Sequence, residues 1–579
     1  MVAKKDFVIR LAGEGGQGMV TASEALAAAA AQVGYHVMTF VTFPSQIMGG
    51  PTWSQCRIST TPALSNGDEL DVLVAFNEDG FNTHKGELRD GGIIIYDSAV
   101  FEIGAEEQKT LNSVALPYQE LGKSTGNPRA ANMVILGAIA EFVNWPEQYL
   151  SDFNVRRFTR GRPNDKEVVD ANEMGLQLGK TASQESGFSL GELAKPEPPD
   201  YEQILIKGND SLSAGAIAGD VELFVGYPIS PATTILTFME ANLKGEGKFV
   251  YQSSSEIESI TAISGGAFAG KRSMTSTAGP GFSLMSEGLG MAWMMELPLV
   301  VVDAQRGGPA TGLPTKTEQS DLYMAMHPAH GDAQLPVIAP GTVEECFYAA
   351  MHALNWAERY QGPVIVLSDH MLTERTQNIK KPDPHLIPIE RRDFYKGSDD
   401  DYLRYEGDSV TAMPIPGGPG AYVANASEHD GIGDTTHLPQ RHVDGTDRRF
   451  NKLKTLEDSL YESRNTHHSI AVMPWGGQKG PTHEAYEKLM EDGIDVAWYY
   501  TMFLSPLNPK LIAELQKKDL VIVPELNYLG QFSSILRQHR INAESITQYT
   551  GLPFKVNHLV DEITNIVKNQ SNSKTKAGV

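Results

Sequence analysis

Cysteine is scarce in this chain of 579 residues, which has only two, Cys56 and Cys346, far apart in the sequence. An iron–sulfur cluster takes about four thiolates, and cysteine-based zinc sites and disulfide frameworks need closely spaced or paired cysteines. The chain therefore cannot hold a cluster by itself and has neither a zinc spacing nor a disulfide framework. We expect no metal ligand in it.

Basic residues and long apolar runs are also lacking. Lysine and arginine number 48 against 72 aspartates and glutamates, a formal net charge of −24. This balance argues against a nucleic-acid partner, which needs a basic face, and against attraction to anionic membranes. No apolar run approaches the ~20 residues of a membrane span. Lys4 and Lys5 lead into a predicted strand without a signal-peptide pattern, so we expect a cytoplasmic protein.

What the chain does contain is a repeated alternation of short apolar runs and helical segments. This alternation predicts an α/β fold built on parallel sheets, and the length allows about three or four domains. A stiff, proline-rich segment marks one boundary, and a charged, weakly periodic segment marks another. The predicted parts are a first domain 1–194, a linker 195–203, a second domain 204–384, an extended crossing segment 385–465, a last domain 466–569 and a polar tail 570–579. The alternative for 385–465 is a disordered insert.

The turn Gly13–Gly18 matches the pattern G-x-G-x-x-G between a predicted strand and the predicted helix Met19–Val33. Backbone N–H groups at a helix N-terminus suit a phosphate. A dinucleotide site also needs an acidic residue at the end of the second strand, but that strand ends at Thr42, and Glu14 and Gln17 would crowd a pyrophosphate. Three interpretations stay open: a dinucleotide site, a contact with another phosphorylated ligand or domain, and a structural turn.

Three Gly/Pro-rich loops, Tyr227–Pro231, Thr277–Phe282 and Arg306–Thr315, each follow an apolar run that predicts a buried strand. The carboxyl ends of parallel strands meet at one sheet edge, where α/β proteins bind ligands. Arg306, held between glycines and prolines, suits a carboxylate that its planar fork can bind in bidentate fashion. The alternative is a surface ion pair. Ser230 offers a hydroxyl to a ligand or serves only as a helix cap.

Glu256 begins a predicted helix rich in small and apolar residues. A carboxylate in a first helical turn is usually an exposed residue that interacts with the helix dipole. The apolar neighbours predict burial instead, and a buried glutamate needs a partner. Glu258 is the competing carboxylate and would point to a different face of the helix.

These loops carry a resemblance to a known family. Tyr227–Pro231 (YPISP), Thr277–Leu289 and Arg306–Asp321 closely resemble the alpha part of the 2-oxoacid:ferredoxin oxidoreductases. Gly13–Gly18 and Phe43–Thr52 resemble the family's gamma part, and Pro524–Gln531 resembles its transketolase-C-terminal-like domain. The resemblance covers nearly the whole chain. It implies a gamma-type Rossmann-like domain, a thiamine-diphosphate-binding domain of the pyrimidine type and a transketolase-C-terminal-like domain.

The resemblance also implies an activity. The family is thiamine-diphosphate-dependent, decarboxylates a 2-oxoacid, passes electrons through a 4Fe-4S cluster to ferredoxin and transfers the acyl group to coenzyme A. The implied residues are Tyr227, Pro228, Ile229 and Glu256 at the thiamine pyrimidine, Arg306 and Ser230 at the substrate carboxylate, Thr315 near the substrate side chain, and Gly15 and Gly16 at coenzyme A. Glu256, Arg306 and Ser230 are the implied catalytic residues.

Two parts of such an enzyme are missing from the sequence: cluster cysteines and the GDG…N motif that binds diphosphate and magnesium. In the family both belong to a beta subunit, which implies an alpha2beta2 heterotetramer that is active only when complete. The expected substrate is 2-oxoglutarate, with pyruvate or broader 2-oxoacids as alternatives. Lys316 and His327 are unranked candidates for a second anion receptor.

Two other classes remain as alternatives. A dinucleotide-dependent dehydrogenase is disfavoured because the second predicted strand lacks its acid. An inactive scaffold subunit is disfavoured because a scaffold would not need Glu256 together with Arg306.

Overall fold

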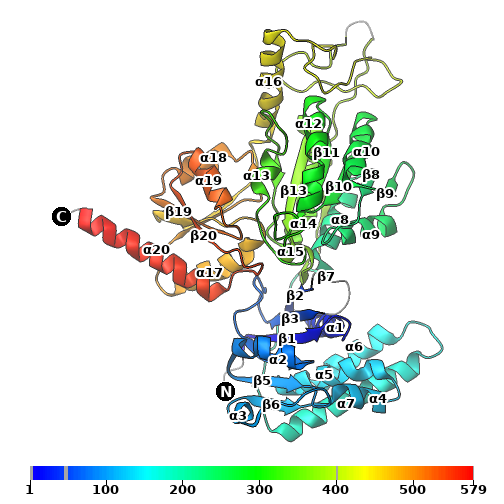
Figure 1. The fold of residues 1–579 in the computed structure, drawn as a ribbon, viewed down its shortest axis with the longest axis vertical. Helices are drawn as coiled ribbons and strands as arrows, with labels where there is room; N and C mark the ends of the chain where they lie inside the picture. The colour runs from blue at the N-terminus through cyan, green and yellow to red at the C-terminus, as the bar shows by residue number, and fades with distance from the viewer. Residues whose placement is uncertain (1–3, 45–49, 198, 399–401, 578–579) are drawn as a thin grey trace. The chain divides into compact units, whose positions relative to one another are not determined.

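The computed structural model describes residues 4–44, 50–197, 199–398 and 402–577, so Ser45–Gly49 of the predicted motif Phe43–Thr52 lie outside the described residues. The chain forms two compact units (Figure 1). Unit 1 extends to Ile206 and includes Arg375–Lys381, and unit 2 comprises Lys207–Glu374 and the chain from Pro382 onward. Within the described residues, no helix combines the length and apolarity needed to cross a bilayer.

Unit 1 contains an eight-stranded sheet. Its strand order is β6 (Asn112–Ala115), β5 (Leu88–Tyr96), β4 (Leu70–Ala75), β1 (Asp6–Glu14), β3 (Pro51–Ser59), β2 (His36–Thr42), β14 (Thr376–Lys380) and β7 (Gln203–Lys207). The sheet is mixed rather than parallel throughout, because β3 runs antiparallel to both β1 and β2. The strand β3 was not predicted from the sequence, because its polar and apolar residues are interspersed and form no apolar run.

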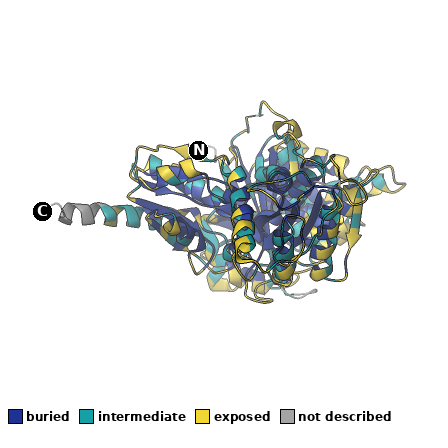
Figure 2. Ribbon diagram, turned by 90° about the horizontal axis from the view of Figure 1, so that it is seen from above, coloured by how far each residue is buried: buried dark blue, intermediate teal, exposed yellow. Residues whose placement is uncertain are grey.

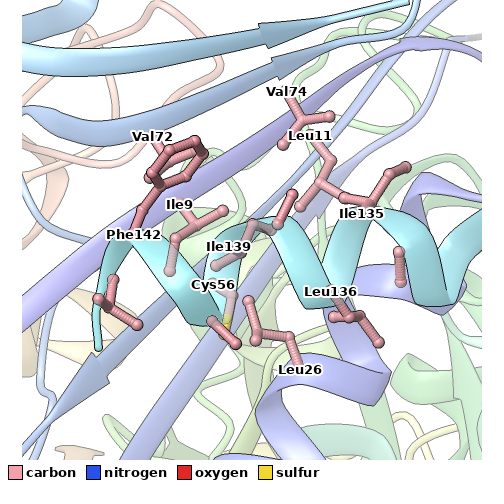
Figure 3. Close-up of a cluster of buried hydrophobic side chains, with 14 of the residues drawn as sticks. Ile9, Leu11, Leu26, Cys56, Val72, Val74, Ile135, Leu136, Ile139 and Phe142 are labelled. Carbon is pink, nitrogen blue, oxygen red and sulfur yellow. The ribbon is translucent and has the colours of Figure 1, made fainter. Parts of the chain in front are cut away.

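One core of unit 1 lies between this sheet and the helices α1 (Met19–Gln32) and α5 (Ala131–Phe142) (Figure 3). Alternate strand residues such as Ile9 and Leu11 point into it and meet Leu26 and Ile139 from the helices. Cys56 belongs to this core, and burial raises the pKa of its thiol to about 12, so it behaves as a small apolar side chain. The helices α6 (Glu147–Phe158) and α7 (Asp165–Ser186) complete this layer.

Unit 2 is built on a seven-stranded sheet. Its order is β18 (Phe503–Ser505), β12 (Val337–Ile338), β13 (Pro363–Asp369), β11 (Leu299–Gln305), β10 (Ser273–Thr277), β8 (Leu223–Gly226) and β9 (Phe249–Gln252). All neighbours are parallel except β12 and β18. Every residue of β11 and β13 is buried, as expected for central strands covered on both faces. The covering helices include α8 (Gly208–Ala218), α9 (Thr233–Asn242), α10 (Glu256–Phe268), α12 (Ser286–Met294) and α14 (Val343–Tyr360).

A five-stranded sheet forms the last part of unit 2. Its order is β15 (Glu462–Arg464), β17 (Ala497–Tyr500), β16 (Ile470–Val472), β19 (Leu520–Glu525) and β20 (Ala543–Thr547). Its core includes side chains from α17 (Lys479–Glu491) and α20 (Val556–Ala577). Burial follows the layers, with the strands mostly buried and many helices exposed on their outer faces (Figure 2).

The segment predicted as extended, 385–465, contains the helix α16 (Pro439–Leu453) (Figure 1). The buried residues of α16 are mostly charged, which explains why apolar periodicity did not predict this helix. Two of them, Arg448 and Lys452, pair with Glu296, a fully buried carboxylate that follows α12, whereas Arg449 pairs with Glu428. Arg448 donates Nε to Glu296 Oε1 at 2.8 Å, and Lys452 Nζ lies 2.9 Å from Oε2. Arg404 lies 3.7 Å from the same oxygen, so three cations surround one carboxylate.

Because three cations surround it, Glu296 should contribute strongly to the stability of the fold. Burial alone would raise its pKa, but the charges of Lys452, Arg404 and Arg448 outweigh burial and hold the pKa well below its usual range. Glu296→Gln should lower the free energy of unfolding by about 3–5 kcal/mol, because it leaves buried cations without their counter-charge. Chemical denaturation measures the effect. The matched control is Glu287→Gln, on a side chain 84% exposed; equal stability of the two variants would contradict the prediction.

Candidate functional site

The loops singled out in the sequence converge at one edge of the seven-stranded sheet. The strands β11, β10, β8 and β9 are neighbours in that order. Arg306 follows β11, and the loop Thr277–Phe282 begins at the last residue of β10. Tyr227–Pro231 follows β8, and Glu256 comes after β9. Because these four strands run parallel, all four segments leave the sheet at the same end. The convergence predicted from the sequence is confirmed.

Arg306 is held inside this edge and is only 7% exposed. Its Nη1 donates to the backbone carbonyl of Ser230 at 2.6 Å, which ties the loop after β11 to the loop after β8. Its Nε has no hydrogen-bond partner among the described residues, and burial lowers the pKa of the guanidinium. An arginine nevertheless stays charged in proteins. The alternative of a surface ion pair is excluded by the burial of the side chain.

The loop after Arg306 folds back on itself. The N–H of Leu313 donates to the carbonyl of Gly307 at 2.8 Å, and the N–H of Gly307 donates to the carbonyl of Lys316 at 3.1 Å. These bonds bring Thr315 and Lys316 back beside the residue that follows Arg306. Thr315 is half-buried at this place.

Ser230 does not cap a helix. The helix α9 begins at Thr233 and its N-cap is Ala232, without a side-chain hydrogen bond. The helix-cap interpretation of Ser230 is therefore wrong, and its hydroxyl is exposed beside the carbonyl that binds Arg306. Tyr227 and Pro228 of the same loop are also exposed, and Ile229 is half-buried.

The two carboxylates at the start of α10 have different surroundings. Glu256 is buried, with 6% of its surface exposed, as its apolar neighbours predicted. Glu258 points elsewhere and accepts hydrogen bonds from Ser254 and Tyr251. These bonds, that of Ser254 foremost, lower the pKa of Glu258 to about 2. Glu258 therefore serves the structure of the helix start, and Glu256 is the carboxylate that faces the interior.

Glu256 lies against Gly281, in the loop after β10. A Cβ at Gly281 would lie 2.5 Å from Glu256 Oε1 and 2.2 Å from Thr277 Oγ1, so only glycine leaves room for the carboxylate. The side chain of Glu256 has no hydrogen bond or ion pair within the part of the chain that the structure describes. A buried acceptor without a protein donor fits a ligand that brings its own polar group.

A second pair of acids at this edge was not predicted from the sequence. Asp303 is fully buried near the end of β11, opposite Thr277 of β10, and Asp321 lies against Gly279 of the neighbouring loop. Burial first, and then the charge of Asp321, raise the pKa of Asp303 well above its usual range. Burial also raises the pKa of Asp321 to about 6. The pair therefore holds at least one proton at neutral pH, and Arg306 is the nearby cation that acts on both.

Asp303→Asn should stabilise the protein, increasingly so as the pH rises. In the unfolded chain Asp303 ionises near pH 4, whereas in the folded chain it keeps its proton, so folding takes up a proton at higher pH. The wild type therefore loses stability above pH 4, and the asparagine variant avoids this loss. The difference in unfolding free energy should grow by up to about 1.4 kcal/mol per pH unit. Denaturation between pH 5 and 8 measures it, with the exposed Asp492→Asn as control; a pH-independent difference would contradict the prediction.

The glycine turn of unit 1 follows β1. Gly16 has a φ of +97°, and a Cβ there would meet no atom within 4 Å, so its backbone is open to a ligand. Gly15 donates to the carbonyl of Gly50 at 3.2 Å. The side chain of Gln17 folds into the turn and accepts from the N–H of Glu14 at 2.7 Å. The turn is thus partly filled by its own residues, as the sequence analysis anticipated for Gln17.

Comparison with family models places both units in one class. Residues 214–445 match the model described as "Pyruvate flavodoxin/ferredoxin oxidoreductase, thiamine diP-bdg". Residues 8–182 match the model "Pyruvate ferredoxin/flavodoxin oxidoreductase". The fold and the site therefore define a thiamine-diphosphate-binding oxidoreductase subunit.

Relatives narrow the class to one family. The chain is 31% identical to the 2-oxoglutarate oxidoreductase subunit KorA of Mycobacterium tuberculosis, over 97% of this chain and 91% of that protein. It is 28% identical to the alpha subunit of 2-oxoacid:ferredoxin oxidoreductase 1 of Aeropyrum pernix, over 98% of each. Among solved structures, 2-oxoglutarate:ferredoxin oxidoreductase from Magnetococcus marinus, with 2-oxoglutarate, coenzyme A and succinyl-CoA bound, matches with a TM-score of 0.91 and 36% identity over 97% of this chain and 100% of that chain. The chain belongs to the 2-oxoacid:ferredoxin oxidoreductases, as an alpha subunit with a gamma-type domain fused at its N-terminal side.

Proposed function

We propose that this subunit takes part in the reversible conversion of 2-oxoglutarate, coenzyme A and oxidised ferredoxin to succinyl-CoA, carbon dioxide and reduced ferredoxin. The observation that carries the proposal is the buried Arg306, which has no carboxylate partner at salt-bridge distance among the described residues and shares a sheet edge with the buried Glu256. Such a guanidinium at a ligand-binding edge suits the carboxylate of a 2-oxoacid. Similarity to relatives named for 2-oxoglutarate supports the choice of substrate.

Each residue of the site then has a role. Thiamine diphosphate, when bound, supplies the nucleophilic carbon for the 2-oxo group. Glu256 would hold a proton in a hydrogen bond to the pyrimidine nitrogen, and Tyr227, Pro228 and Ile229 would line the ring. Arg306 would bind the substrate carboxylate, Ser230 would add a hydrogen bond from its hydroxyl, and Thr315 would lie beside the substrate side chain.

The remaining chemistry belongs to partners. Both cysteines are buried and too few for a cluster, so the 4Fe-4S cluster, the magnesium ion and the diphosphate site belong to a beta subunit in an alpha2beta2 heterotetramer. Gly15 and Gly16 would help to bind coenzyme A through backbone N–H groups, for which the open face of Gly16 gives support. We place the complex in the cytoplasm, with ferredoxin as its electron acceptor. We propose the domain boundaries that were predicted from the sequence, and α16 lies inside the crossing segment 385–465.

The test is anaerobic co-expression with the beta chain, followed by viologen reduction with coenzyme A and single 2-oxoacids. We expect 2-oxoglutarate to be the fastest substrate. Faster reduction with pyruvate would overturn the substrate and keep the family. No reduction with any 2-oxoacid, in a complex loaded with cluster and thiamine diphosphate, would favour the inactive scaffold.

A further inference from the structure

Lys316 is a partly buried cation without a counter-charge. Its side chain is half-buried, and burial lowers the pKa of its ammonium, with no carboxylate nearby to oppose the effect. No ion pair or hydrogen bond of this ammonium occurs among the described residues. Other buried lysines of unit 2 are paired: Lys452 lies 2.9 Å from Glu296, and Lys479 lies 2.6 Å from Glu345. Lys316 differs from these paired lysines, and it lies in the loop that begins with Arg306.

The backbone places Lys316 beside Arg306. The carbonyl of Lys316 accepts the N–H of Gly307, the residue after Arg306, at 3.1 Å. The stem of Lys316 packs on Gly551, where a Cβ would lie only 2.9 Å from Lys316 Cβ. The backbone of Lys316 is thereby held beside Gly307, and its stem is held against Gly551.

His370 lies near both cations. In the pairing of β11 with β13, Gln305 is opposite Asp369, so the next residues, Arg306 and His370, emerge side by side. On the other side, the hydroxyl of Thr317, next to Lys316, accepts the N–H of Met371 at 3.3 Å. Burial, followed by the charges of Lys316 and Arg306, lowers the pKa of His370 to about 4, so the ring is neutral at pH 7. Its Nδ1 has no partner among the described residues.

We propose that Lys316 binds the distal carboxylate of a dicarboxylic 2-oxoacid while Arg306 binds the carboxylate next to the keto group. Two cations close to one neutral imidazole match a substrate with an anion at each end. His327, the other candidate from the sequence, is exposed at the end of α13 (Leu322–Met326), and its Nδ1 lies 2.9 Å from the carbonyl of Ala333. The inference rests on the proposed function and identifies a residue that determines its specificity.

The test compares Lys316→Met with the wild type in the complete complex, using 2-oxoglutarate and the monocarboxylate 2-oxobutyrate. A hydrogen-bonded charge pair of this kind corresponds to a roughly ten- to hundredfold rise in KM for 2-oxoglutarate. Activity with 2-oxobutyrate should be unchanged or higher. Lys316→Arg should recover part of the affinity for 2-oxoglutarate, and Lys518→Met, on a half-buried lysine that binds backbone carbonyls of Thr466 and His468, should behave as wild type.

Inhibition by glutarate, an unreactive dicarboxylate, gives a second measurement. Its inhibition constant should rise in Lys316→Met in parallel with the KM for 2-oxoglutarate. Equal losses with both 2-oxoacids, or no loss with either, would overturn the role of Lys316 while leaving the proposed function in place. A wild-type complex that reduces viologen with no 2-oxoacid would instead overturn the proposed function.

Discussion

Glu256→Gln should leave the complex assembled and lower kcat by about 10²–10⁴-fold, the usual contribution of a positioned acid–base group. Glutamine keeps the shape of the side chain, and Gly281 still leaves room for it. The amide cannot take up and hold a proton, so the hydrogen bond to the pyrimidine nitrogen would lose its acid–base function. Steady-state turnover with saturating thiamine diphosphate, coenzyme A and 2-oxoglutarate measures the effect.

Glu258→Gln is the matched control for this substitution. It changes the same kind of side chain in the same helical turn, but one that binds Ser254 and Tyr251 instead of facing the interior. We expect its turnover to remain close to that of the wild type. Equal turnover of Glu256→Gln and the wild type would remove Glu256 from the catalytic residues.

Arg306→Ala should weaken capture of the substrate by roughly 2–5 kcal/mol, the range for truncating one partner of a buried, hydrogen-bonded charge pair. Arg306 is buried and already oriented by the carbonyl of Ser230, so no other side chain can take its place without moving the loop. The loss should appear in kcat/KM for every 2-oxoacid, because all of them carry the carboxylate next to the keto group. Arg306→Lys should be intermediate, since an ammonium lacks the planar fork.

The proposed roles of Arg306 and Lys316 can be distinguished by the substrates that each variant impairs. Arg306→Ala should impair 2-oxoglutarate and 2-oxobutyrate alike, whereas Lys316→Met should impair the dicarboxylate. Arg464→Ala, on an exposed arginine of the same unit, is the control for loss of charge alone. Unchanged KM and turnover in Arg306→Ala would place Arg306 outside the site.

Much of the fold could be predicted because its signals are local. The apolar run Phe7–Ala12 lies within β1, and the run Leu299–Val302 lies within β11. The predicted helix Met19–Val33 agrees with α1 to within its last residue. The antiparallel β3 was missed because its polar alternation does not stand out, and α16 was missed because it buries arginine and lysine instead of apolar side chains.

At the site, too, the residues with a local sequence signal were predicted and those without one were missed. Arg306, Ser230 and Glu256 could be singled out because glycine, proline and apolar neighbours mark the loops and the helix start that carry them. The acids Asp303 and Asp321 were not recognised, although the phrase Val302-Asp303-Ala304-Gln305-Arg306 places a carboxylate inside an apolar strand. Their pairing depends on the contact of β11 with the segment that ends at Asp321, which no local pattern records.

By itself, the sequence determined the α/β class, the strands and loops that carry Arg306, Ser230 and Glu256, and the residue types in each of these loops. These properties follow from short-range hydropathy and from the backbone preferences of glycine and proline. Only the tertiary structure decided that β11, β10, β8 and β9 are neighbours in that order, which differs from their order in the chain. It also decided that Glu256 is buried beside Gly281 while Glu258 is not, and that Lys316 returns to Arg306. Burial and proximity arise from residues distant in sequence, so they appear only when the sheet has formed.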